Sequence, residues 1–133
     1  MLKLILAAGL AILATAAPAA DYQCQRVKFK CSGFEPNWAF RPGSGGTIKF
    51  SDPENTNGGQ PPLVITACAT PLAGGQTSIT TGAPLGLSAT VKPQSCLETD
   101  GTTATPYSIS ISYTQGAAGG TPRQVSGTGC CRK

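Results

Sequence analysis

Histidine is absent from this chain of 133 residues, and tryptophan and methionine occur once each. Without imidazole the chain cannot build a Ser-His or Cys-His nucleophile, which excludes the hydrolases that depend on one. A two-carboxylate glycosidase would need a pair among the six Asp and Glu residues. Glu35 and Asp100 are a conceivable pair, but nothing in the sequence brings them together. We therefore expect a protein that is not an enzyme.

Cofactor and metal motifs are missing as well. The glycine-rich stretches lack the Lys-Ser/Thr pair and the following helix of a phosphate-binding loop, so we interpret them as turns. The stretch from Asp52 to Gly58 places Asn57 where a calcium-binding EF-hand loop has glycine. No paired Cys-x-x-Cys spacing compensates for the missing histidines, which argues against zinc. The sequence predicts neither a metal nor a cofactor.

The amino terminus holds the one extended apolar run. Lys3 is followed by the apolar segment Leu4 to Ile12 and by the small-x-small site Ala17-Pro18-Ala19, which is the pattern of a cleaved secretory signal. The run is shorter than the roughly 20 residues that cross a bilayer, so no stable membrane span is expected. We interpret residues 1–20 as a signal peptide and residues 21–133 as a single β domain that is periplasmic or secreted.

Alternation of polar and apolar residues dominates the rest of the chain and predicts an all-β fold. From Tyr107 to Thr114, Tyr and Ile alternate with Ser and Thr, which indicates a strand with one buried face. The segment from Tyr22 to Cys31 alternates in the same way. Seven or eight short strands joined by Gly-rich turns predict a small antiparallel barrel or sandwich. The other predicted strands are 47–50, 63–68, 77–81 and 85–91.

The six cysteines are expected to form disulfides. An export signal favours disulfides over a metal site, and the even number predicts that no thiol is free. On a strand the side chains of Cys130 and Cys131 point to opposite faces, and a bond between these neighbours would close a strained ring. Each should therefore bond to a different, distant cysteine, while the spacing leaves the partners open. The cysteines are Cys24, Cys31, Cys68, Cys96, Cys130 and Cys131.

A pattern of motifs spans most of the chain: Cys31 to Trp38, Cys96 to Gly101, Pro106-Tyr107 and Gly129 to Arg132. It resembles a family of small, largely uncharacterised exported bacterial proteins. Their sequences open with Cys-x-Gly-x-Glu-Pro-Phe-Trp and close with Gly-Cys-Cys-Arg. The resemblance implies a Gram-negative periplasmic β domain and carries no known activity. It also implies that Cys31 and Cys96 are the partners of Cys130 and Cys131, which leaves Cys24 and Cys68, additional to the family pattern, as the third pair.

Glu35 and Trp38 form the most suggestive local cluster. A tryptophan beside a carboxylate can stack on a sugar ring and hold its hydroxyl groups. Glu35, Trp38 and Asp100 are therefore the candidate ligand-binding residues. The competing interpretation is that Trp38 packs in the core and Glu35 caps a turn, and we favour it because a lone large aromatic usually serves the core of a small domain. Solvent exposure of Trp38 separates the two interpretations.

The basic cluster of Arg26, Lys28 and Lys30 is interpreted as the solvated face of a strand, with binding of anionic polysaccharide or lipid headgroups as the alternative. The favoured function is an exported β domain that binds an envelope or extracellular ligand, a glycan or a protein, without catalysis. The alternative is a structural or stress-related cell-envelope protein with no dedicated ligand site. Nucleic acid is not expected as a partner.

The signal pattern makes a first prediction. The exported protein should lack residues 1–19 or 1–20 and contain no free thiol, because cleavage follows Ala19 or Ala20 and the cysteines are even in number. Intact mass of periplasmic material, with and without an alkylating reagent, measures both. Alkylation without prior reduction would contradict complete pairing.

Overall fold

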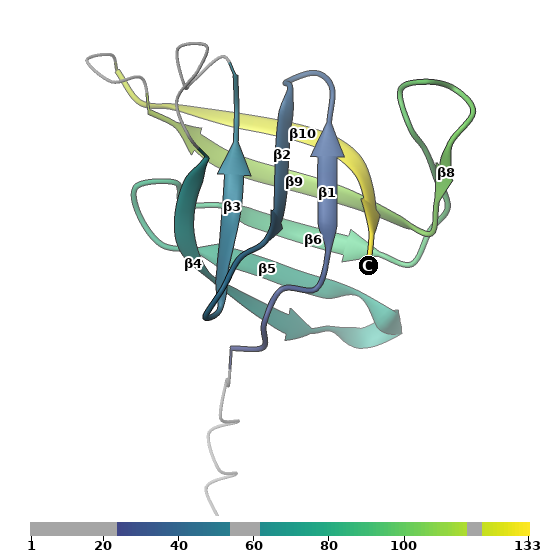
Figure 1. Cartoon of the computed structure of the whole chain (residues 1–133), viewed down its shortest axis with the longest axis horizontal. Helices are drawn as coiled ribbons and strands as arrows, with labels where there is room; N and C mark the ends of the chain where they lie inside the picture. Colours follow the sequence, from purple (N-terminus) through teal and green to yellow (C-terminus); the bar gives the residue numbers. More distant parts are fainter. Residues whose placement is uncertain (1–23, 54–61, 117–120) are drawn as a thin grey trace, which may run out of the picture.

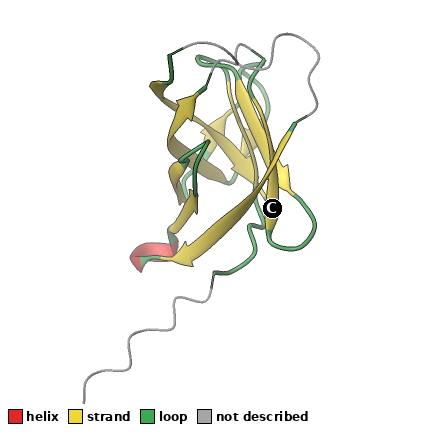
Figure 2. Ribbon diagram, turned by 90° about the vertical axis from the view of Figure 1, so that its left-hand side faces the viewer, coloured by secondary structure: helices red, strands yellow, loops and turns green. Residues whose placement is uncertain are grey.

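The computed structural model describes residues 24–53, 62–116 and 121–133, which form ten β-strands and one short 3₁₀ helix. Figure 1 shows the strands in chain order, and Figure 2 shows them from the side, wrapped around one interior. The predicted signal peptide lies outside the described residues. The elements are β1 (Lys30–Gly33), β2 (Trp38–Pro42), β3 (Thr47–Ser51), β4 (Leu63–Pro71), η1 (Ala73–Gly75), β5 (Thr77–Thr81), β6 (Ser88–Lys92), β7 (Cys96–Leu97), β8 (Ala104–Thr105), β9 (Tyr107–Gln115) and β10 (Arg123–Arg132).

Eight of these strands close into an antiparallel barrel in the order β1-β10-β9-β6-β5-β4-β3-β2. The chain moves from each strand to its neighbour, except that β7 and β8 form a separate hairpin between β6 and β9. Closure leaves the barrel without a free edge, which removes the unpaired backbone groups of an open sheet. The prediction of a small all-β barrel or sandwich stapled by disulfides is confirmed, and of the two architectures the structure has the barrel. No helix in the described ranges is long and apolar enough to cross a membrane.

The alternation that predicted a strand from Tyr107 to Thr114 is realised in β9. Ile109, Ile111 and Tyr113 are buried inside the barrel, whereas Ser110 is exposed on its outer face. Both neighbours of β9 are fully paired with it, because β10 lies along one side and β6 along the other. The strands predicted at 47–50, 63–68 and 77–81 correspond to β3, β4 and β5, whereas the strand predicted at 85–91 begins only at Ser88, as β6.

The segment before β1 is not the continuous strand that its alternation predicted. Of residues 24–29 only Gln25 pairs, through two backbone hydrogen bonds of 3.1 Å with Ala69 on β4. The segment instead passes beneath one end of the barrel in Figure 1, where Val27 and Phe29 are buried in the core. The alternation therefore reports side chains that enter the core while the backbone stays largely outside the sheet.

Trp38 lies in the barrel interior, 1% exposed, and stacks on Phe40 with ring centroids 5.9 Å apart. Its indole fills space above glycines of the adjoining strands. A Cβ atom added to Gly129 would lie 3.0 Å from the indole, one on Gly127 would lie 3.4 Å away, and one on Gly33 closer still. A Cβ on Gly129 would lie closer still to the backbone of Ser32, and one on Gly127 would lie 3.1 Å from Pro36. Together these contacts explain why β10, which the sequence pattern did not reveal, has glycines at inward positions where a strand usually has apolar side chains.

All six cysteines are paired, and the pairs agree with the family resemblance, which had left open which of Cys31 and Cys96 bonds to Cys130. Cys131 points into the barrel and joins the first and last barrel strands, whereas Cys130 points outward and holds the β7–β8 hairpin against β10. The opposite orientations of these neighbours are as predicted. The third bond ties the segment before β1 to β4. The pairs are Cys24–Cys68, Cys31–Cys131 and Cys96–Cys130.

Asp52, the first acidic residue of the stretch considered for calcium, is 1% exposed at one end of the barrel. Its carboxylate accepts hydrogen bonds from the Tyr113 hydroxyl at 2.6 Å and from the Gln115 side-chain amide at 2.8 Å. Arg123 in turn donates to the Gln115 side-chain oxygen at 2.8 Å. Buried polar groups need such partners, so Asp52 serves the fold.

The β9 burial pattern makes a stability prediction. Replacing Ile111 with Ala should lower the free energy of unfolding by about 2 to 5 kcal/mol, because it removes apolar contacts and leaves a cavity in the core. Replacing the neighbouring Ser110 with Ala, on the exposed face, should change it by less than about 0.5 kcal/mol. Urea unfolding followed by the fluorescence of Trp38 measures both. Equal effects of the two substitutions would contradict the assigned faces.

Candidate functional site

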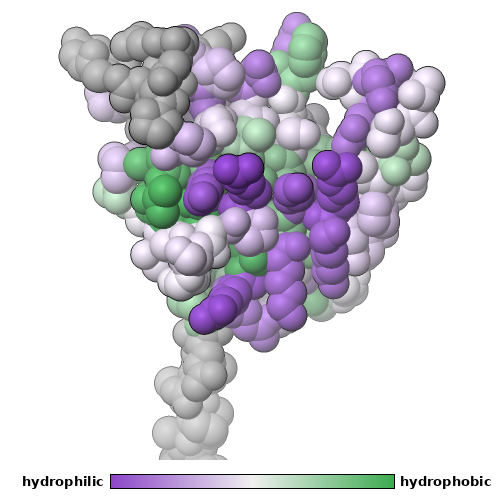
Figure 3. Space-filling view, in the orientation of Figure 1, coloured by the Kyte–Doolittle hydropathy of each residue, from purple (hydrophilic) through white to green (hydrophobic). Residues whose placement is uncertain are grey.

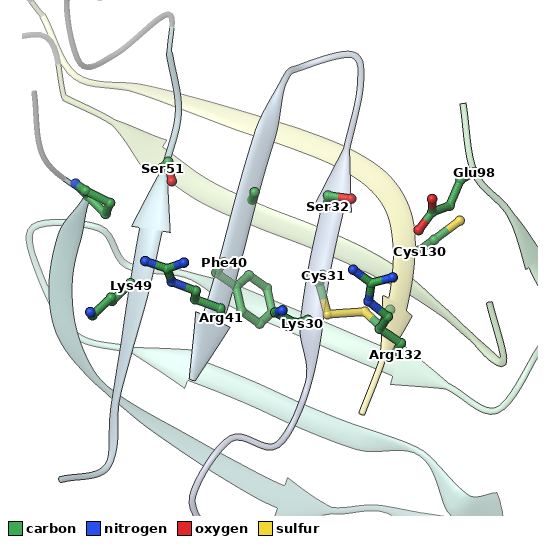
Figure 4. Close-up of a pocket in the computed structure, with 13 residues that line it drawn as sticks. Lys30, Cys31, Ser32, Phe40, Arg41, Lys49, Ser51, Glu98, Cys130 and Arg132 are labelled. Atoms are coloured by element: carbon green, nitrogen blue, oxygen red, sulfur yellow. A yellow bond between two sulfur atoms is a disulfide. The ribbon is translucent and has the colours of Figure 1, made fainter. Parts of the chain in front are cut away.

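Four cationic side chains form one row across the outer face of β3, β2, β1 and β10. Strand register aligns them: Arg41 is opposite Lys49, and Lys30 is opposite Arg132. Lys30 and Arg41 each lie next to the Cys31–Phe40 pair at the end of the β1–β2 register, on the same side of it. Neighbouring strands lie about 4.8 Å apart, so the row spans about 14 Å. Figure 3 shows hydrophilic side chains gathered across this face, and Figure 4 shows the four cations on their strands. We call Lys49, Arg41, Lys30 and Arg132 the basic row.

The basic row concentrates positive charge that the described residues do not neutralise. Like charges directly opposite one another on paired strands destabilise a sheet, and the row contains such pairs side by side. No ion pair with a nitrogen-to-oxygen distance of 4.0 Å or less occurs in the described ranges. Three of the four side chains are exposed and Lys49 is half-buried. This electrostatic cost would be relieved by a bound anion.

A groove of about 350 Å³ runs beside the basic row. Its floor is the next row of outward positions, where side chains are small: Ser51, Ala39, Ser32 and Cys130. Pro62 and Glu98 also line this depression, and Figure 4 shows Glu98 beyond β10. The alternation of large cationic and small neutral positions thus creates the hollow. We call it the basic groove.

A second depression, of about 670 Å³, lies between the β1–β2 turn and the β7–β8 hairpin, over the outer faces of β10 and β9. Two exposed apolar side chains line it, Phe34 at 62% and Leu97 at 61% exposure. Its charged residues are Glu35, Glu98 and Lys92. Hydroxyl and amide side chains supply most of the remaining lining, namely Ser32, Gln94, Ser95, Thr99, Ser108, Ser110 and Thr128. We call it the polar cleft.

The three candidate ligand residues from the sequence do not converge. Trp38 is buried beneath the glycines of β10, so the favoured interpretation that it packs in the core is confirmed, and its candidate role of stacking on a sugar ring at the surface is wrong. The glycines that admit the indole into the barrel are the physical reason. Glu35 is exposed and lines the polar cleft, whereas Asp100 lines neither depression. Of the three, Glu35 alone remains a candidate for contact with a ligand there.

Asp100 instead organises the tip of the β7–β8 hairpin. Its carboxylate accepts hydrogen bonds from the backbone N–H groups of Thr102 at 2.9 Å and Thr103 at 2.8 Å, and from the Thr103 hydroxyl. The hydroxyl and backbone hydrogen bonds of Thr103, followed by those of Thr102, lower the pKa of Asp100 to about 2. The side chain thus stabilises a turn in the manner typical of Asp.

Three of the four members of the basic row were not recognised from the sequence. Arg41 and Lys49 each lie four residues from Gly45 in the turn between β2 and β3, so a hairpin centred there would have shown them facing one another. Arg132 joins the row only because the last strand pairs with the first. Lys30 was noted, but as part of a cluster with Arg26 and Lys28, which are exposed before β1 and line neither depression.

The Asp100 turn makes a titration prediction. Replacing Thr103 with Val should raise the pKa of Asp100 from about 2 toward its ordinary value of 3.8, because the largest stabilising hydrogen bond is lost. A depressed pKa means that ionised Asp100 stabilises the folded turn above its unfolded pKa, and that this contribution disappears as pH falls toward 2. Carboxyl ¹³C chemical shifts measured against pH test the shift, with Thr99→Val as control. An unchanged titration in the Thr103 variant would refute the assignment.

Comparison with known proteins yields no assignment: no protein family, no curated protein and no solved structure matches this chain significantly. The resemblance drawn from the sequence motifs therefore remains a prediction. In the described ranges, no group of three or more His, Cys, Asp and Glu side chains could hold a metal ion. Among the described residues, the outer surface of the barrel, and above all the basic row, carries the most distinctive chemistry.

Proposed function

We propose that this protein is an exported, non-catalytic binding protein whose ligand carries anionic groups and lies in the basic groove. The observation that supports the proposal is the basic row, four cations on adjacent strands without a paired carboxylate among the described residues. Export is supported by the signal pattern and by three disulfides, which persist outside the cytoplasm.

The order of side chains along the row suits carboxylate, sulfate or phosphate groups. Arginine and lysine alternate, as Arg132, Lys30, Arg41 and Lys49. A guanidinium can bind such a group through two parallel hydrogen bonds, while an ammonium acts as a point charge that adapts to its position. The small side chains of the groove floor allow a ligand to approach the strands closely.

A structural or stress-related envelope protein is the second candidate. Burial of Trp38 favours it, because the most suggestive sequence motif then serves the core. A measurement of anion binding separates the two candidates, since a purely structural protein would have no specific anion site.

The proposal predicts that two substitutions in the row weaken anion binding. The double variant Lys30→Gln/Arg41→Gln should bind heparin, an anionic polysaccharide probe, about tenfold more weakly than the unaltered protein, because each lost contact is worth about 0.2 to 1 kcal/mol. Isothermal titration calorimetry gives the dissociation constant. Raising the salt concentration from 50 to 200 mM should lower the heparin affinity of the unaltered protein more than that of the variant.

The matched control is Arg26→Gln/Lys28→Gln, which removes the same charge from exposed positions outside the groove. It should leave the affinity within about twofold, since screening weakens distant charges. Equal losses in the two double variants would show that binding follows net charge alone. No binding by the unaltered protein would favour the structural candidate.

A further inference from the structure

We propose, building on the anion-binding function above, that the ligand is a glycan chain that extends from the basic groove into the polar cleft. In this arrangement the anionic groups lie along the basic row, and uncharged sugar residues occupy the cleft. The inference rests on the continuity of the two depressions and on the difference between their linings.

The two depressions adjoin one another on the barrel surface. Both are lined by Ser32, Cys130 and Glu98. Ser32 and Cys130 are directly opposite on β1 and β10, and Glu98 follows β7 on the attached hairpin. The Cys96–Cys130 disulfide therefore holds the hairpin at the boundary between groove and cleft.

Together the depressions form one track across six adjacent strands. The basic groove crosses β3, β2, β1 and β10, and the polar cleft continues over β10, β9 and the end of β6. With neighbouring strands about 4.8 Å apart, the track is about 24 Å long. A single phosphate or lipid headgroup would fill only part of it, whereas a linear polymer can follow its full length.

The lining of the polar cleft favours sugar hydroxyls. Carboxylates accept hydrogen bonds from hydroxyl groups, and Ser and Thr hydroxyls can both donate and accept. Glu35 and Glu98 supply the carboxylates, and Ser108, Ser110 and Thr128 the hydroxyls. The exposed ring of Phe34 offers an apolar face for a sugar ring. Phe34 could thus stack on a sugar in the way that Trp38, being buried, does not.

The same carboxylates disfavour a uniformly charged polymer. Two acidic side chains and a single cation, Lys92, line the cleft, so a negative group there meets net repulsion. The basic row attracts negative groups only a few strands away. The surface therefore selects a glycan whose charges are separated by uncharged sugars, in preference to a nucleic acid or a fully charged polyuronate.

Oligosaccharides of two to ten sugars test the inference. Hyaluronan oligosaccharides carry a carboxylate on every second sugar, and oligogalacturonides of equal length carry one on every sugar. For the unaltered protein, hyaluronan affinity should rise with length until the track is filled, and should exceed that of the matched oligogalacturonide. Phe34→Ala should weaken the longest hyaluronan oligosaccharide about threefold to tenfold and leave the shortest unchanged.

Leu72→Ala is the matched control, because Leu72 is exposed at 43% and lines neither depression. Thermal unfolding should show that the Phe34→Ala and Leu72→Ala variants both fold normally. If affinity depends on Lys30 and Arg41 but not on Phe34 or chain length, the extended track is refuted and the basic groove stands. If no oligosaccharide of either series binds, the anion-binding function itself fails. Tighter binding of single-stranded oligothymidylate than of hyaluronan would overturn the glycan assignment.

Discussion

Pairing of β1 with β10 is the constraint on which the rest of the structure depends, because it joins the two ends of the sheet into a barrel. The register places Cys31 opposite Cys131, and the disulfide between them lies inside the barrel at that seam. A shift of one residue would turn every side chain of β10 to the other face. Cys131 would then leave the interior, and Cys130 would no longer reach the hairpin outside.

The same seam determines what the barrel can contain. Trp38 fits because Gly127 and Gly129 of β10 and Gly33 of β1 have no side chains to compete for the space. The cost of this burial is that the indole N–H of Trp38 has no hydrogen-bond partner among the described residues. An unsatisfied buried donor costs about 1 to 3 kcal/mol. Burial of the large apolar ring contributes in the opposite direction, as expected where a small domain depends on a few large side chains.

The outer face carries the functional proposals for a related reason. Because the interior is filled by side chains, a ligand can reach this barrel only from outside. Barrel closure aligns Arg132 with the cations of β1, β2 and β3, and the disulfide at Cys130 fixes a hairpin beside them. A scaffold cross-linked in this way can hold like charges together that a looser sheet would allow to separate. The charge pattern thus depends on the stability of the fold.

The sequence by itself determined the fold class and much of the core. Strict alternation in 107–114 and 85–91 identified inward-facing residues such as Ile111 and Val91, because a strand alternates its faces along the chain. The opposed orientations of Cys130 and Cys131 followed from the same rule. Tertiary structure alone decided which strands are neighbours, and neighbour relations concern residues far apart in sequence. The tertiary structure therefore buried Trp38 beneath glycines of β10 and brought Arg132 beside Lys30. It also left Asp100 outside the polar cleft that Glu35 lines. Alternation within one segment carries no information about which distant segments pair with it. The core could therefore be predicted from the sequence, whereas the surface site could not.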